Sequence, residues 1–187
     1  MSNDNNDLDF TNWQPPPAAP EPPVVANAQP QRQSVAARAE FDLALDAIIA
    51  RAERTLRIFD PTLADFGMGT PAREEQLGAF LRKSRNTRLM IVVHDTAYIS
   101  GRAPRLIRLL RQFSHAVAIH QTHEAIRNID DVLVIADESH CLRRPHFGQP
   151  RGILLTDDPV ETRGWLNRFN EIWDQSSPAV SATTIGL

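Results

Sequence analysis

The residues best placed for acid–base chemistry stand where two apolar segments end. His94 and Asp95 follow the apolar segment 88–93, and Asp60 follows the segment 55–59. Ligands of open α/β sheets bind where strand ends and helix starts converge, and a carboxylate can orient an imidazole that transfers a proton. This spacing predicts an acid–base cluster of His94, Asp95 and Asp60. The competing interpretation is that an aspartate at a strand end only forms a turn.

A second group of reactive side chains falls between residues 120 and 146. It consists of four histidines and the one cysteine, namely His120, His123, His140, Cys141 and His146. Structural zinc sites usually have more closely spaced ligand pairs, so we expect no metal and no other cofactor. His120 remains a candidate nucleophile or base. A single cysteine excludes an internal disulfide and favours a buried thiol in a reducing compartment.

Arginine supplies nineteen of the twenty basic side chains, and Lys83 is the single lysine. Guanidinium groups bind phosphate through two parallel hydrogen bonds. An anion-binding surface could therefore use five arginines, namely Arg105, Arg108, Arg143, Arg144 and Arg151. A solvated helix face would explain the arginines of segment 104–112 equally well. The sequence has no Gly-x-Gly-x-x-Gly, P-loop or Gly-x-Ser-x-Gly motif, which removes the commonest dinucleotide, nucleotide and serine-hydrolase functions.

Charge and proline content divide the chain into an arm and a domain. Residues 1–30 hold seven of the fourteen prolines, four acidic residues and no basic one. Such a segment buries too little apolar surface to offset the entropy of ordering it. We predict a disordered arm over 1–33, one domain over 34–176 and a flexible tail over 177–187. No apolar run approaches the length of a bilayer crossing, and we expect a bacterial, cytoplasmic protein.

Helices and strands alternate through the predicted domain. Apolar periodicity and proline positions predict helices from Ser34 to about Arg54, over about 72–84, from Pro104 and from Pro159. Short β-favouring runs predict strands over 55–59, 88–94, 116–120, 132–137 and 152–156. Right-handed crossovers place helices on both faces of such a sheet. The pattern predicts an α/β fold, a three-layer α/β/α sandwich around a mixed sheet.

Three segments near the end of this domain resemble the closing part of a phospholipase D-like half-domain. They are 130–137 (Asp-Asp-Val-Leu-Val-Ile-Ala-Asp), 151–159 (Arg-Gly-Ile-Leu-Leu-Thr-Asp-Asp-Pro) and 169–173 (Phe-Asn-Glu-Ile-Trp). In that family a His-x-Lys-x-x-x-x-Asp signature lies on the first of these strands, so its positions fall on Asp130, Val132 and Asp137. The resemblance implies that only Asp137 is kept. The nucleophilic histidine and the charge-stabilising lysine are both replaced, and segment 138–150 lacks the family's Gly-Ser-x-Asn turn.

We therefore expect a phospholipase D-like half-module that is not catalytic and acts by binding a protein or a phosphate-bearing anion. Active members of the family pair two half-modules, so the resemblance implies a homodimer or a partner domain. One alternative is a phosphodiesterase or nuclease with a rearranged site that uses His94 or His120. The other is a nucleic-acid-binding protein that uses the arginine-rich helix face.

Overall fold

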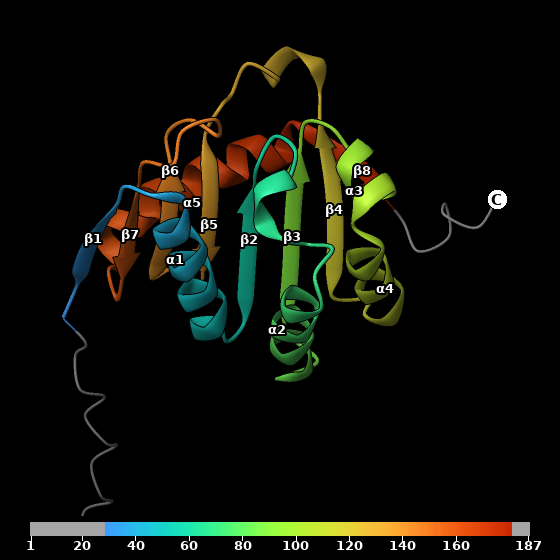
Figure 1. Cartoon of the computed structure of the whole chain (residues 1–187), viewed down its shortest axis with the longest axis horizontal. Helices are drawn as coiled ribbons and strands as arrows, with labels where there is room; N and C mark the ends of the chain where they lie inside the picture. The colour runs from blue at the N-terminus through green and yellow to red at the C-terminus, as the bar shows by residue number, and fades with distance from the viewer. Residues whose placement is uncertain (1–28, 181–187) are drawn as a thin grey trace, which may run out of the picture.

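A computed structural model describes residues 29–180, and these residues form one mixed eight-stranded sheet (Figure 1). The predicted arm up to residue 28 and the tail from residue 181 lie outside the described residues. The strands are β1 (Gln31–Val35), β2 (Thr55–Phe59), β3 (Arg88–Val93), β4 (Val117–Thr122), β5 (Val132–Ala136), β6 (His140–Arg144), β7 (Gly152–Thr156) and β8 (Ser176–Val180). Their order across the sheet is β1-β7-β6-β5-β2-β3-β4-β8.

The sheet combines a parallel centre with antiparallel flanks. β2, β3 and β4 run parallel to one another. β5 runs antiparallel to β2, and β6, β7 and β1 continue as an antiparallel series on that side. β8 is antiparallel to β4 and closes the other side. The prediction of a mixed sheet is confirmed.

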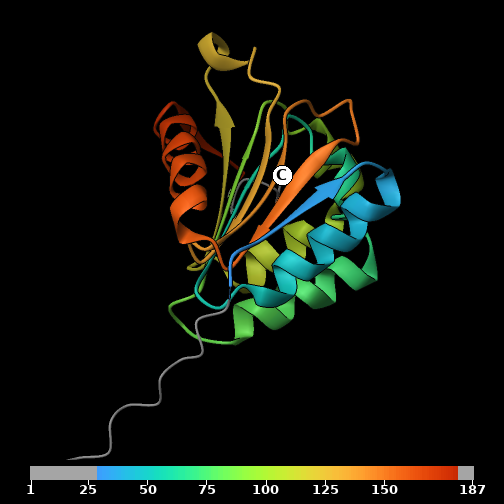
Figure 2. The ribbon, with the colours of Figure 1, turned by 90° about the vertical axis from the view of Figure 1, so that its left-hand side faces the viewer.

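Helices cover both faces, which confirms the three-layer sandwich. They are α1 (Arg38–Arg51), α2 (Pro71–Arg82), α3 (Ala97–Arg102), α4 (Pro104–Gln112) and α5 (Pro159–Asp174). Figure 2 shows α5 alone on one face, with α1, α2 and α4 on the other. Pro71, Pro104 and Pro159 each stand in the first turn of their helix, where the missing N–H has no intrahelical partner to lose.

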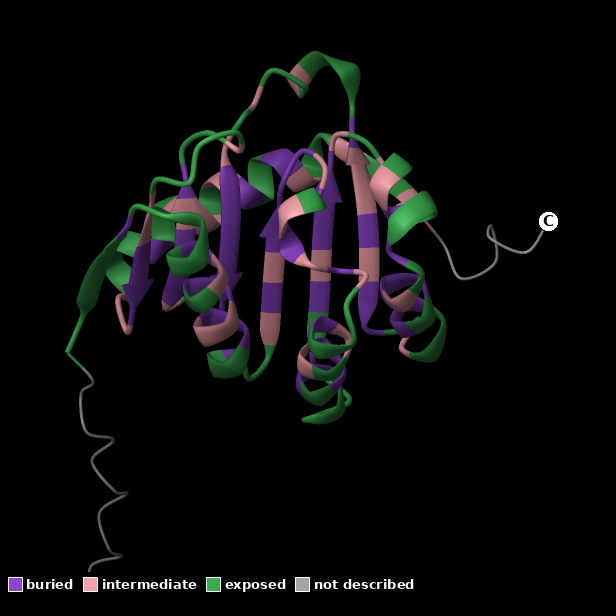
Figure 3. Cartoon of the chain, viewed as in Figure 1, coloured by how far each residue is buried: buried purple, intermediate pink, exposed green. Residues whose placement is uncertain are grey.

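The central strands are buried because both of their faces pack against helices (Figure 3). Ile58 of β2 and Ile91 of β3 belong to the larger core under α1, α2 and α4. Phe59 and Val92 face the smaller core under α5, where they meet Phe169. This burial on two faces explains why β3 is a nearly continuous apolar run.

Both edge strands lie where the sequence did not predict them. Ser34 was expected to cap the first helix, but it pairs with Ile153 in β1, and the helix begins only at Arg38. The side chain of Glu40 accepts hydrogen bonds from the backbone N–H of Ala36 and Ala37 instead. At the other end, Ser176–Val180 forms β8 inside the range expected to be a flexible tail.

Two internal elements were also not predicted, namely β6 and the short helix α3. β6 has the sequence His-Cys-Leu-Arg-Arg, in which three of five residues are polar or charged. β6 can be buried because Asp60 and Asp65 neutralise the guanidinium group of its Arg144 inside the fold. None of the helices within residues 29–180 has the length and apolar character needed to cross a membrane.

Candidate functional site

The carboxyl ends of the parallel strands meet at the upper edge of the sheet in Figure 1. We call this the carboxyl-end edge and define it by the residues that follow β2, β3 and β4, precede β5 and end or follow β6. They are Asp60, His94, Asp95, His123, Asp130, Arg144 and His146. The predicted acid–base residues therefore do lie at one edge, where ligands of open α/β sheets bind.

His94 has both ring nitrogens engaged within the fold. Nε2 lies 2.7 Å from the carbonyl oxygen of Ile129, and Nδ1 lies 2.7 Å from the hydroxyl oxygen of Thr122. A carbonyl only accepts, so in the neutral imidazole Nε2 donates and the lone pair of Nδ1 accepts from Thr122. No lone pair is left to attack phosphorus or to take a proton from water.

The carboxylates predicted to join His94 are engaged elsewhere. Asp60 accepts hydrogen bonds from the N–H groups of Thr62 and Leu63 at 2.9 and 2.6 Å. Asp95 accepts one from the N–H of Ala97 at 2.9 Å, at the start of α3. Both therefore act as the turn-forming aspartates that the sequence left as the competing interpretation. Burial raises the pKa of the Asp60 carboxyl, although its hydrogen bonds and Arg144 oppose that effect.

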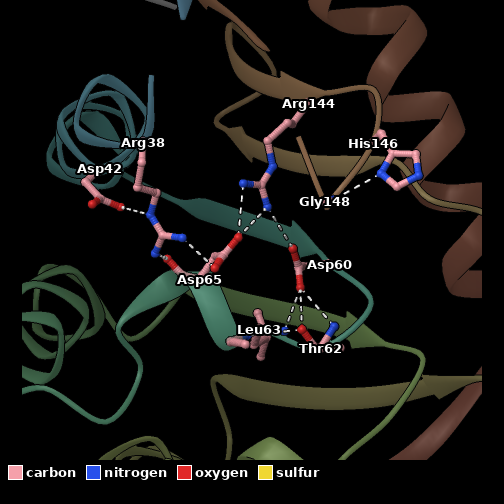
Figure 4. Close-up of polar contacts among 10 residues, drawn as sticks. Arg38, Asp42, Asp60, Thr62, Leu63, Asp65, Arg144, His146 and Gly148 are labelled. Atoms are coloured by element: carbon pink, nitrogen blue, oxygen red, sulfur yellow. Dashed lines mark hydrogen bonds and ion pairs between the residues drawn. The ribbon is translucent and has the colours of Figure 1, made fainter. Parts of the chain in front are cut away.

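An ion-pair network connects the β2–α2 loop to β6 and α1 (Figure 4). Arg144 is 2% exposed, and both of its terminal nitrogens lie 3.1 Å from one oxygen of Asp65. It also lies 3.7 Å from Asp60 and stacks on Phe41 at 4.4 Å. Arg38 donates to the other oxygen of Asp65 at 2.5 Å. Burial favours a higher pKa for Asp65, but hydrogen bonds from Arg38 and Arg144 outweigh it and lower the pKa.

Arg144 lies close to the position at which the resemblance implies a charge-stabilising lysine. The resemblance aligns Val132 with the family's lysine, and Arg144 is the direct partner of Val132 across β5 and β6. Directly opposed residues project to the same face of a sheet. The guanidinium group of Arg144 therefore lies beside the side chain of Val132, where the resemblance implies a lysine. Asp60 and Asp65 neutralise it, however, and a phosphate would have to displace a carboxylate to reach it.

Asp130, which the resemblance aligns with the family's nucleophile, faces His146. Nε2 of His146 lies 3.5 Å from a carboxylate oxygen of Asp130. Nδ1 of His146 accepts a hydrogen bond from the N–H of Gly148 at 3.0 Å, so in the neutral ring the proton is on Nε2 and the lone pair is engaged. Neither Asp130 nor His146 was predicted as a site residue. His146 lies in the loop that follows the unpredicted strand β6, which brings it back beside Asp130 at the start of β5.

Asp137, which the resemblance aligns with the signature aspartate, lies at the other end of β5 and accepts hydrogen bonds from the backbone. Its carboxylate accepts hydrogen bonds from the N–H groups of Glu53, Arg54 and Thr55, the last two at 2.7 and 2.8 Å. Its φ is +49°, a left-handed conformation that aspartate tolerates better than most residues. Asp137 therefore anchors the turn that leads into β2.

His120 lies within β4 and away from the carboxyl-end edge. Its ring stacks on Trp173 of α5 at 3.8 Å, and Nδ1 lies 3.1 Å from the hydroxyl oxygen of Ser176. Burial lowers the pKa of His120. Its ring forms no hydrogen bond or ion pair with an arginine or carboxylate among the described residues, so a phosphate bound there would lack a cation.

The histidines and the cysteine do not converge as a metal site. His140 lies on β6, and three strands separate it from His120 on β4. Nδ1 of His140 accepts from the N–H of Asp157 at 3.1 Å, and burial lowers its pKa. Burial raises the pKa of Cys141 to about 12. Among residues 29–180, no three or more His, Cys, Asp or Glu side chains form a metal-binding group.

The five arginines predicted to bind anions lie on different surfaces. Arg105 and Arg108 of α4 share one carboxylate, that of Glu74, at 2.6 and 3.1 Å. Arg143 stacks on Trp165 of α5 at 3.9 Å, on the opposite face of the sheet from Arg144. Arg151 is exposed just before β7. The structure therefore does not bring these side chains together.

Comparison with known proteins identifies the family of this chain. A family model described as a domain of unknown function, DUF7931, matches residues 37–183. No curated protein sequence matched the chain. Among solved structures, Nuc from Salmonella typhimurium, a phospholipase D family member, is similar with a TM-score of 0.60 and 13% identity over 82% of this chain and 100% of Nuc.

Two further structures share the fold at similarly low identity. NucT from Helicobacter pylori has a TM-score of 0.53 and 9% identity, over 81% of this chain and 100% of NucT. TrmBL2, described as an archaeal chromatin protein with a novel mode of DNA binding, has a TM-score of 0.61 and 10% identity, over 83% of this chain and 57% of TrmBL2. The chain therefore belongs to the DUF7931 domain family and has the fold of the phospholipase D-like proteins.

Proposed function

We propose that this chain is a non-catalytic phospholipase D-like module that acts by binding a protein partner. The observation that carries the proposal is the state of the imidazoles at the carboxyl-end edge. The Nδ1 atoms of His94 and His146 both accept hydrogen bonds from the fold in the neutral ring. A nucleophilic imidazole needs a free lone pair directed at phosphorus, and these two rings do not offer one.

The charge of the carboxyl-end edge also opposes a phosphodiester. Among the residues that define this edge, three carboxylates, those of Asp60, Asp95 and Asp130, outnumber the one guanidinium, that of Arg144. Figure 4 shows Arg144 already paired with Asp60 and Asp65. A phosphate group brings another negative charge into this surplus, which raises the electrostatic free energy. This balance supports protein binding over anion binding at this edge.

The expected partner is a second copy of the chain. The resemblance to the phospholipase D-like family implies paired half-modules, and this chain supplies one half-module. Light scattering coupled to size-exclusion chromatography on the full chain, at two concentrations tenfold apart, would give its mass in solution. A mass of twice 20.9 kDa is expected. A monomer at both concentrations would contradict the homodimer and direct the search to another protein.

Absence of catalysis is tested by hydrolysis of a generic phosphodiester, bis(p-nitrophenyl) phosphate, and of fluorescent single- and double-stranded DNA. We expect no turnover above that of buffer. Turnover that persists in purified protein would support the alternative, a hydrolase with a rearranged histidine site.

Histidine variants would then identify the source of any turnover. His123 is exposed at the carboxyl-end edge, whereas His115 is exposed in the turn before β4 at the other end of the sheet. Turnover lost in His123→Ala or His146→Ala but kept in His115→Ala would assign catalysis to the carboxyl-end edge. Turnover unchanged in all three variants would indicate a contaminating enzyme.

A further inference from the structure

Four exposed basic residues gather at the opposite end of the sheet, where β2 and β3 begin. They are Arg54, Lys83, Arg85 and Arg88, and we call them the amino-end basic patch. The backbone N–H of Arg88 bonds to the carbonyl oxygen of Arg54 at 2.8 Å. The side chain of Arg88 bonds to the carbonyl oxygen of Arg85 at 3.1 Å, and that of Lys83 to Ala52 at 2.9 Å. These contacts place the four residues on one continuous surface.

The positive charge of this patch is only partly neutralised. Lys83 pairs with the exposed carboxylate of Glu53 at 2.6 Å. Arg88 bonds to carbonyl oxygens, which leave its charge intact. Among residues 29–180, no carboxylate forms an ion pair with Arg54, Arg85 or Arg88. When Glu53 and Asp137 are both counted, because the Asp137 carboxylate accepts from the backbone N–H of Arg54, the patch has a net charge of +2, four cations minus two carboxylates. The chain as a whole has a net charge of −3.

The patch surrounds a depression that polar groups line. An open pocket of about 430 Å³ lies between Arg54 and Lys83, and Ser84, Asn86, Thr87 and Glu53 complete its lining. The hydroxyl group of Ser84 and the amide group of Asn86 can donate hydrogen bonds to phosphate oxygens alongside guanidinium and ammonium groups. The buried hydroxyl of Thr87 already donates to carbonyl oxygens of the chain. The combination of surplus positive charge and neutral donors matches a phosphate group.

The arginine-rich face of α4 is a weaker candidate for the same chemistry. Arg105 and Arg108 both pair with Glu74, and the hydrogen bond from Arg105 lowers the pKa of that carboxyl first of all. Glu74 therefore neutralises one of the two positive charges of this pair. The amino-end basic patch keeps a net charge of +2 after Glu53 and Asp137 are counted, so it should attract a polyanion more strongly than this pair.

We propose that the amino-end basic patch binds the sugar–phosphate backbone of double-stranded DNA without reading its sequence. The cations come from two turns and a strand start and form an open surface, which fits a repeating polyanion. No aromatic side chain lines the pocket, so stacking on unpaired bases has no platform there. This surface lies at the opposite end of the sheet from the carboxyl-end edge, and the inference does not depend on the absence of catalysis there.

The test is fluorescence anisotropy of a labelled 20-base-pair duplex with the full chain at several sodium chloride concentrations. Each neutralised phosphate contributes about −0.9 to the slope of log affinity against log salt. Three to four contacts therefore predict a slope of roughly −3. Binding that is absent, or that does not weaken with salt, would overturn the proposal.

Two charge-matched variants separate the patch from net charge. The triple variant Arg54→Gln, Arg85→Gln, Arg88→Gln should lose at least about tenfold in affinity at low salt, with a slope no steeper than about −1 because only Lys83 remains. The control triple Arg108→Gln, Arg151→Gln, Arg163→Gln removes the same charge from other exposed positions and should keep the slope. Equal losses in both triples would overturn the assignment.

Two further measurements address misfolding of the triple variant and binding of a small phosphate. If the patch triple does not fold, the single reversal Arg85→Glu in the exposed turn is used instead, and the same loss is expected. Inorganic phosphate is added at an ionic strength matched with chloride. Duplex binding should then be unaffected. Displacement by inorganic phosphate would show that the pocket takes a small phosphate and would overturn binding to a polymer.

Discussion

At the scale of single residues, Asp137 stabilises the backbone of the turn that leads into β2. Its carboxylate accepts hydrogen bonds from three successive N–H groups, those of residues 53–55. Charged acceptors form stronger hydrogen bonds than neutral ones. The turn into β2 therefore depends on a residue that the family resemblance would first suggest as part of an active site.

Replacement of Asp137 separates its two contributions. Asp137→Ala loses the carboxylate and keeps the left-handed φ of +49°, and should lower the free energy of unfolding by about 3 kcal/mol. Asp137→Gly relieves the strain but loses the same hydrogen bonds, so about 2 kcal/mol is expected. Urea unfolding followed by circular dichroism measures both. A glycine variant as stable as the parent would show that the carboxylate contributes nothing.

Asp65 gives the fold a dependence on acid. Its pKa in the folded protein is lowered by Arg38 and Arg144 against the opposing effect of burial, so it stabilises the fold above its unfolded pKa of about 3.9. That stabilisation is lost as the pH falls through the lowered folded pKa. Asp65→Asn should therefore cost about 2–3 kcal/mol at pH 7, a figure reduced because Asp65 is 34% exposed.

The measurement is urea unfolding of the parent and Asp65→Asn between pH 7 and pH 2. The difference between them should shrink below pH ~4. Asp42→Asn is the matched control, because Asp42 pairs with Arg38 while both are about half exposed, and it should cost less than about 1 kcal/mol. A difference for Asp65→Asn that stays constant with pH would contradict the ionic role.

The residue types at the carboxyl-end edge were predictable, but their partners were not. Asp60, His94 and Asp95 could be placed at one edge because each follows a strand that the sequence shows plainly. The groups that engage them come from distant segments, such as Ile129 for His94 and Arg144 for Asp60. Local periodicity has no information about such contacts, which depend on the strand order of the whole sheet.

At the scale of elements, the loop over residues 123–131 is fastened to the sheet by His94. This loop contains the short 3-10 turn η2 (Glu124–Ile126) and rises above the sheet in Figure 1. His94 joins the end of β4 at Thr122 to the carbonyl group of Ile129. One imidazole ring, that of His94, therefore forms hydrogen bonds to residues at both ends of the loop.

His94→Ala should loosen this loop without unfolding the sheet. Loss of the two hydrogen bonds should lower the free energy of local opening by about 1.4 kcal/mol, which is about tenfold faster amide exchange. Hydrogen–deuterium exchange of peptides covering 124–131 measures the effect. His123→Ala is the control, since it removes an exposed imidazole from the same loop. Equal acceleration in both variants would contradict the fastening role of His94.

Elements were predictable where local pattern and tertiary environment agree. The bounds of β2 and β7 match the prediction, since both are short β-favouring runs between turn residues. β1 was mistaken for the start of a helix because Val35 continues the apolar spacing of α1. β8 contains Pro178, which is tolerated because this is an edge strand. Edge strands carry little hydrophobic signal, so pairing alone identifies them.

At the scale of the whole molecule, the buried thiol of Cys141 reports on global unfolding. Cys141 is 0% exposed in the core under α5, and burial raises its pKa to about 12. We expect a disulfide reagent at pH 8 to label the native protein at least about a thousandfold more slowly than the urea-unfolded protein. Labelling at the rate of the unfolded chain would show that the core under α5 opens locally.

The two ends of the sheet differ in charge, so charge is separated along the strand direction of the molecule. The carboxyl-end edge carries a surplus of carboxylates, whereas the amino-end basic patch has a net charge of +2, four cations minus two carboxylates. Such a separation orients a charged partner during its approach. A protein partner at the first end and a polyanion at the second would be bound without competing.

The position of β1 and β8 at opposite edges of the sheet has a consequence for circular permutation. Gln31 and Val180 lie at the same end of the sheet but with eight strands between and including their own. Seven spacings of about 4.8 Å separate them by roughly 34 Å. A peptide joining them would need at least about ten extended residues. A permuted chain with a shorter joint would have to give up one edge strand.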